Sequence, residues 1–171
     1  LEILGQLAMI DDDLDAKEQA FIQSFADAWQ IHIDWVDVQK SYGSHNGYGF
    51  QSLRKTMKEY LSSNPPQQQA SQLADVISLL INIDNVVTAE EELMHAELNG
   101  LINKYLGQGD IDVYNAVVVP QHDEQEMEFK ELLGDLKKIK FAGGFAYVSE
   151  PFYSFKYAET VCERYRTVNL F

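Results

Sequence analysis

The sequence has one cysteine, few basic residues and no long apolar stretch. Cys162 alone cannot form an internal disulfide or a cysteine-based zinc site. Lys and Arg total 13 against 27 Asp and Glu, and the net charge of −14 disfavours nucleic acid or anionic lipid as the main partner. No apolar run approaches about 18 residues and no signal peptide opens the chain. We therefore expect a cytoplasmic protein without membrane insertion.

Apolar residues are abundant, at 46% of 171 residues, and aromatics reach 12%. This composition is enough for a packed core and argues against wholesale disorder. The chain begins with Leu1 instead of Met and ends on the apolar run Val168-Asn-Leu-Phe171. We interpret it as a piece of a longer polypeptide.

Residues 1–107 are expected to be helical throughout, because apolar residues recur there at helical spacing. The first such stripe consists of Phe21, Ile22, Phe25, Ala28 and Trp29. Three further stripes fall within residues 50–61, 73–83 and 94–105, and a short helix is expected from Asp34 to about Tyr42 before a glycine-containing loop at 43–47. Gly107 is a plausible left-handed cap for the last helix.

After Gly107 the pattern changes, and the whole chain is expected to belong to the α+β class. Strands are expected at 113–119, 141–148 and 168–171, and helices at 127–139 and 155–165. This β-α-β-α-β order predicts a small α/β domain at 110–171, truncated at its C-terminus, whose strands need crossover connections. The helical part carries most of the charge, with 16 acidic and 6 basic residues.

The most informative feature is an internal repeat with an offset of 73 residues. Leu7-Ala-Met-Ile-Asp11 matches Leu80-Ile-Asn-Ile-Asp84. In each copy an aliphatic residue follows the Asp by three positions and a Glu follows it by seven, which gives Glu18 and Glu91. Each copy predicts a helix, a short acidic turn and a second helix, and the two hairpins are expected to be related by a pseudo-twofold axis.

This repeat resembles the TerB-like family, the helical domain of tellurite-resistance proteins and of a membrane-linked DnaJ-type co-chaperone. The resemblance covers residues 1–107. The family pattern has Asp-Gly where this chain has Asp11-Asp12 and Asp84-Asn85. Asp and Asn tolerate a left-handed backbone better than other non-glycine residues, so we expect the turn to be kept. The resemblance implies a role in stress response through protein partners, with a cation site in the acidic turns.

Two interpretations of the acidic turns remain open. Oxygen ligands from Asp11, Glu18, Asp84 and Glu91 suit a hard cation such as Ca²⁺ or Mg²⁺, bound weakly. The alternative is capping alone, because Asp15-Ala-Lys-Glu18 and Thr88-Ala-Glu-Glu91 both have the spacing of a capping box. An EF-hand is excluded, since its sixth and twelfth positions would be Ala16 and Ile22.

No motif for catalysis is found, and we expect no enzymatic activity and no bound cofactor other than such a cation. The four histidines are dispersed, and Gly143-Gly144 precedes an expected strand instead of a phosphate-binding helix. Nine aromatics fall between residues 141 and 171, and Phe145-Ala-Tyr-Val148 with the segment after it resembles the SPOR family of peptidoglycan-binding domains. The alternative function is therefore a ligand- or glycan-binding protein whose tail carries the activity, unless these aromatics only fill a core.

Overall fold

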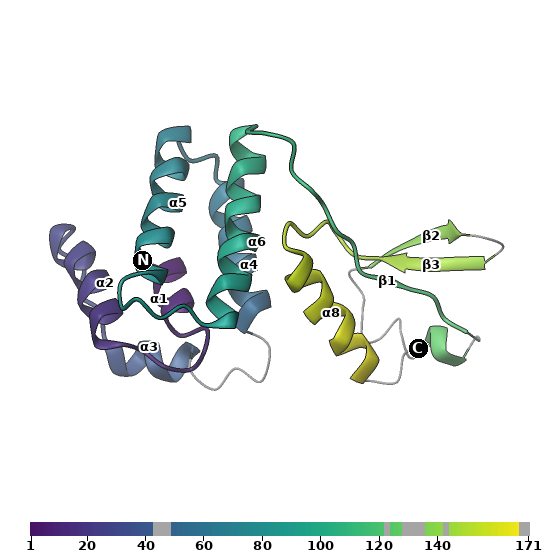
Figure 1. The fold of residues 1–171 in the computed structure, drawn as a ribbon, viewed down its shortest axis with the longest axis horizontal. Helices are drawn as coiled ribbons and strands as arrows, with labels where there is room; N and C mark the ends of the chain where they lie inside the picture. The colour runs from purple at the N-terminus through teal and green to yellow at the C-terminus, as the bar shows by residue number, and fades with distance from the viewer. Residues whose placement is uncertain (43–48, 122–123, 128–135, 142–143, 168–171) are drawn as a thin grey trace. The chain divides into compact units, whose positions relative to one another are not determined.

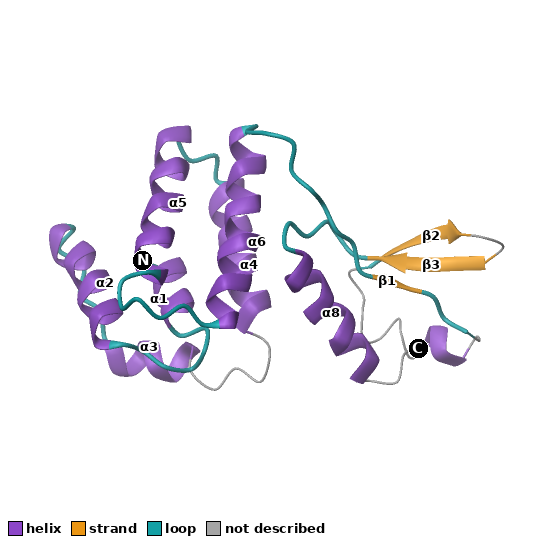
Figure 2. Ribbon diagram, in the orientation of Figure 1, coloured by secondary structure: helices purple, strands orange, loops and turns teal. Residues whose placement is uncertain are grey.

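The computed structural model describes residues 1–42, 49–121, 124–127, 136–141 and 144–167 (Figure 1). The chain forms two compact units, Leu1–Ile111 and Asp112–Phe171. Helices dominate the described residues, and one three-stranded sheet accompanies them (Figure 2). The structure therefore confirms the α+β class at this level. In the described part of the chain, no helix is both long and apolar enough to cross a membrane.

The first unit is built from helices joined by turns, and its described residues contain no strand. Its helices are α1 (Glu2–Ala8), α2 (Ala16–Ala28), α3 (Trp35–Tyr42), α4 (Gly49–Ser62), α5 (Gln67–Ile81) and α6 (Ala89–Leu106). The helix expected before Tyr42 is confirmed; its first N–H groups donate to the carboxylate of Asp34. Gly107 ends α6 with a φ of 67°, as its left-handed cap predicts. The loop expected at 43–47 lies outside the described residues.

Helix α1 is the central element of this unit. Every residue from Ile3 to Met9 is buried, and α1 contacts α2, α3, α4 and α5. Helix α6 contacts both α4 and α5. The most deeply buried large side chains are Leu7, Ile22, Leu53, Met57, Ile77, Leu80, Ile81, Met94, Leu98 and Ile102.

The apolar stripe expected on α2 is partly wrong. The buried positions of this helix are Glu18, Ile22 and Ala26, which follow one another at intervals of four. Trp29 is 76% exposed, because α2 ends at Ala28 and the chain leaves helical geometry there. A stripe read from apolar character alone missed Glu18, since a buried carboxylate breaks the hydrophobic pattern.

The second unit contains a sheet with strands β1 (Val117–Val118), β2 (Lys137–Phe141) and β3 (Gly144–Val148), followed by α8 (Phe155–Thr167). The strand order is β1-β3-β2, and both pairings are antiparallel. The expected crossover connections between the described strands are therefore wrong. Helix α8 confirms the helix expected at 155–165, whereas the strand expected at 168–171 lies outside the described residues.

A hairpin corrects the end of the helix expected at 127–139 and the start of the strand expected at 141–148. Phe141 pairs with Gly144, so the strand expected at 141–148 is divided between β2 and β3. Ile139 belongs to β2, and residues 124–127 form a helical turn. The part of the expected helix at 128–135 lies outside the described residues. The reason lies in the sequence: the run Lys137-Lys-Ile-Lys-Phe141 suits a period of two, and the pair Gly143-Gly144 that follows is a sequence signal for a hairpin.

The strand expected at 113–119 is short and only half-buried. Burial alternates from Ala116 to Val119, because β1 lies at an edge of the antiparallel sheet and has only one face toward the core. Before β1 in the chain, Tyr114 forms a separate antiparallel bridge with Phe152. Of the tail aromatics, Tyr147, Phe152, Tyr157 and Tyr165 are buried. These four aromatic side chains contribute to packing, whereas Phe145 and Phe155 are exposed.

Candidate functional site

The turn between α1 and α2 is held by its own acidic side chains. Asp12 has a φ of 66°, and its N–H donates to the Met9 carbonyl at 3.2 Å. The carboxylate of Asp11 accepts a hydrogen bond from the Asp13 N–H at 3.1 Å. Asp15 caps α2, and Glu18 completes the capping box by accepting the Asp15 N–H at 3.2 Å. This capping box is as the spacing predicts.

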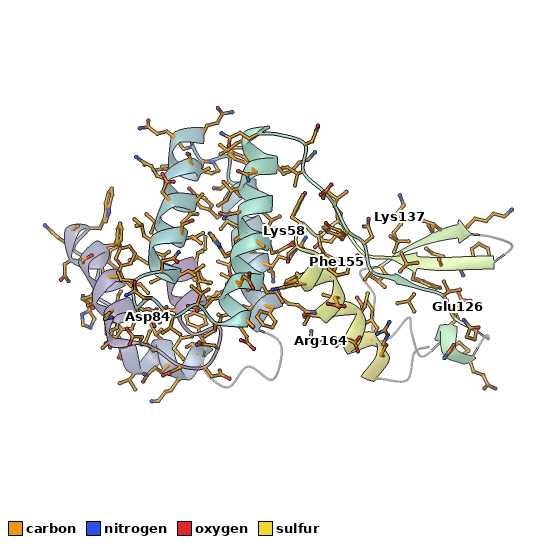
Figure 3. The ribbon with its side chains drawn as sticks, in the orientation of Figure 1. Lys58, Asp84, Glu126, Lys137, Phe155 and Arg164 are labelled. Atoms are coloured by element: carbon orange, nitrogen blue, oxygen red, sulfur yellow. The ribbon has the colours of Figure 1, made fainter. Side chains whose placement is uncertain are left out.

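The turn between α5 and α6 repeats this arrangement. Asn85 has a φ of 68°, and the carboxylate of Asp84 accepts the Val86 N–H at 2.9 Å. Glu91 accepts both the N–H of Thr88 at 2.8 Å and its hydroxyl at 3.0 Å. The second capping box is thus also present, and both positions where the family pattern has glycine take a left-handed backbone. Figure 3 labels Asp84 in this turn, directly after α5.

The two turns are electrostatically linked at one buried carboxyl group. Glu18 is 5% exposed, and burial is the largest cause that raises its pKa from 4.5 to about 8, while the hydrogen bond from the Asp15 backbone lowers it. Negative charge on three neighbours raises this pKa further; they are Glu91, Asp11 and Asp84. The other three residues singled out by the repeat therefore lie close enough to Glu18 for their charges to act on it. We call Asp11, Glu18, Asp84 and Glu91 the turn cluster.

The turn cluster does not have the geometry of a preformed metal shell. Within the ranges that the structure describes, no three or more His, Cys, Asp or Glu side chains are placed to hold one metal ion. Glu18 and Glu91 each use one carboxylate oxygen to complete a capping box. A cation that binds here would therefore keep much of its water shell, because few protein oxygens face a common point.

A cavity of about 310 Å³ lies beside the first turn, within the first unit. Its lining includes three acidic residues, Asp11, Asp12 and Glu90, which come from this turn and from the start of α6. Two aromatic residues, Tyr42 and Phe50, also line it, at the end of α3 and the start of α4. Sequence reasoning missed this site, since no local pattern connects residues so far apart in the chain.

Sequence reasoning also missed a buried ion pair in the same unit. Arg54 on α4 donates through Nε to the Oε1 of Glu97 on α6 at 2.7 Å, and Glu97 is fully buried. Both residues lie inside the apolar stripes of their helices, at helical spacing from apolar neighbours, and a charged residue in such a position is the signal that could have revealed them. Their ion pair joins α4 to α6.

Comparisons of the chain with protein-family models, with curated proteins and with solved structures found no match. The resemblance to TerB-like domains therefore depends on the residues of the two turns and on their matching hydrogen bonds.

Proposed function

We propose that this chain is a non-enzymatic interaction or sensor module of the TerB-like type, which responds to a hard cation at the turn cluster. The observation that carries the proposal is that two acidic turns, each with a left-handed residue and a capping box, lie close enough together for Asp11, Asp84 and Glu91 to act on one buried carboxyl group, that of Glu18. The charges of Asp11, Asp84 and Glu91 form a negative field around Glu18, and a divalent cation is attracted to that field. Capping explains where Glu18 and Glu91 point, but it does not require two acidic turns to lie together.

The affinity of such a site is expected to be low. Ca²⁺ prefers six to eight oxygen ligands and Mg²⁺ six, whereas two of the four carboxylates already serve as helix caps. The cation would be held mainly through its own water molecules and the field of the cluster. Low affinity suits a sensor of changing cation levels better than a permanent structural site.

Protein partners in the cytoplasm, in a stress-response setting, complete this proposal. The net charge of −14 supports a protein partner over nucleic acid. Exposed apolar side chains at the end of α2 and in α3, including Trp29 and Val36, offer contact area of the kind that protein interfaces use.

Cys162 is half-buried in α8, where burial raises the pKa of its thiol, so it has the character of a packing residue.

The test is a titration of the full chain with Ca²⁺ and, separately, with Mg²⁺, followed by calorimetry and by amide chemical shifts. We expect weak binding, with shifts concentrated at residues 11–18 and 84–91. Asp84→Asn should weaken the binding by about threefold to tenfold, because it removes one negative charge from the field.

The matched control is Asp75→Asn, which removes an exposed carboxylate from α5 outside the turns. It should leave the binding unchanged within about a factor of two. Equal binding by the wild type and Asp84→Asn would refute the cation site, and so would shifts spread evenly over the acidic surface.

A further inference from the structure

We propose that the cavity beside the first turn, here called the acidic cavity, binds a primary ammonium group carried on an aliphatic stem. A free diamine and the side chain of a lysine share this chemistry. The inference goes beyond the hard-cation proposal, with which it shares only Asp11.

The first argument is charge. Three acidic residues line the cavity: Asp11 is half-buried, and Asp12 and Glu90 are exposed to solvent. Among the described residues that line the cavity, none is basic. A positively charged ligand is therefore attracted to the cavity by the acidic side chains of its described lining.

The second argument is the apolar and aromatic lining, which a bare metal ion does not need. Met9 and Ile10 follow directly from the end of α1, and Phe50 lies at the start of α4. Met9 is buried, and Phe50 is half-buried. Methylene groups pack against such side chains, and a cation close to aromatic rings gains further electrostatic attraction. A ligand with a charged head and an aliphatic stem matches both parts of the lining.

The third argument is size and geometry. A cavity of about 310 Å³ is at the lower end of small-molecule sites, which span about 300–1,000 Å³. It suits one side chain or a small amine. The acids come from two separate segments, and the three N–H donors of an ammonium group rotate freely, so the group can bond to an acceptor of either segment. A guanidinium group favours one carboxylate in a planar, bidentate contact, so the arrangement favours ammonium.

The experiment titrates the full chain with two probes and follows amide chemical shifts. One probe is 1,5-diaminopentane, a free diamine, and the other is Nα-acetyl-lysine N-methylamide, which represents a protein-borne lysine. We expect saturable shifts at residues 9–12, 50–52 and 90 for at least one probe, and the tighter probe identifies the source. Nα-acetyl-norleucine N-methylamide, which lacks the charge, should bind at least about tenfold more weakly.

Two matched variants test the position of the site. Glu90→Gln should weaken the binding of the tighter probe by about threefold to tenfold, the effect of one charge-assisted hydrogen bond. Glu92→Gln removes another exposed acid from the same first turn of α6, outside the lining, and should change the binding by less than about twofold. Phe50→Leu keeps an apolar side chain but removes the ring, and it should also weaken binding.

The proposal is overturned if neither ammonium probe gives saturable shifts at the cavity. It is also overturned if the norleucine analogue binds equally, or if Glu90→Gln and Glu92→Gln have the same effect. Titration of these variants with Ca²⁺ separates this result from the turn cluster. Asp84 does not line the cavity, so Asp84→Asn should weaken Ca²⁺ binding and leave probe binding unchanged.

Discussion

Glu18 combines two demands that conflict. As the third residue of α2 it completes a capping box, which requires an oxygen that accepts the Asp15 N–H. Because its side chain is buried and has acidic neighbours, ionisation of Glu18 costs free energy through lost hydration and through repulsion. A protonated carboxyl group meets both demands, because its carbonyl oxygen still accepts the hydrogen bond. The raised pKa of about 8 expresses this compromise.

A pH dependence of stability follows from this single residue. The pKa of Glu18 is about 8 in the folded chain and near 4.5 when exposed, so its stabilising contribution is complete below about pH 4.5 and is lost as the pH rises through about 8. Glu18→Gln keeps an acceptor oxygen and cannot ionise. Between pH 5 and pH 9 the wild type should therefore lose free energy of unfolding relative to this variant, by at most about 5 kcal/mol.

Urea unfolding at a series of pH values measures this difference. Glu59→Gln is the control, because the carboxylate of Glu59 in α4 is exposed to solvent. Its Oε1 lies 3.8 Å from the Nζ of Lys55, which is also exposed. The difference between Glu59→Gln and the wild type should stay nearly constant over the same range. Parallel curves for Glu18→Gln and the wild type would contradict the raised pKa.

At the scale of elements, the helices of the first unit could be predicted, whereas the strands of the second could be predicted only in part. Strands β1 and β3 lie within the expected strands, and β2 was missed. Long helices repeat their apolar residues over several turns and carry caps such as Thr88 and Gly107, so periodicity and end signals agree. Strand β1 has only two residues, which is too short for a period to show. In β2, Ile139 continued the spacing of an expected helix, and only its pairing with Ala146 settles the matter.

The candidate sites differ in the same way. The turn cluster could be predicted because a repeat marks the same positions twice, and both left-handed residues, Asp12 and Asn85, follow from the chemistry of the turn. The acidic cavity could not be predicted, because lining residues such as Phe50 and Glu90 are far apart in the sequence and are brought to one cavity by tertiary packing alone. What the residues could not settle is whether capping uses all of the carboxylate oxygens in the turns.

The Arg54–Glu97 pair connects two helices and predicts a particular response to mutation. Removal of one partner leaves a buried charge, so Glu97→Ala should lower the free energy of unfolding by about 3–5 kcal/mol. The double variant Arg54→Met/Glu97→Leu replaces both charges with apolar groups and should be less destabilised than Glu97→Ala. Chemical denaturation of the single and double variants measures this. A double variant less stable than Glu97→Ala would show that the pair contributes more than it costs.

The whole molecule consists of two compact units that differ in how much core they can build. The unit Leu1–Ile111 contains a helical core around α1, with large side chains that are almost fully buried. The unit Asp112–Phe171 has only 60 residues. Strand β1 of its sheet is only two residues long. Domains near this size bury a smaller fraction of their surface and are correspondingly marginal.

We therefore expect the two units to behave differently as separate fragments. A fragment of residues 1–111 should fold alone, because its core is made of its own helices and its length is typical of an independent domain. It should show a helical circular dichroism spectrum and one cooperative urea transition. A fragment of residues 112–171 should unfold at a lower urea concentration, because so small a unit has little stability to spare. A non-cooperative transition for 1–111, or a higher midpoint for 112–171, would show that the stability of the chain is distributed otherwise.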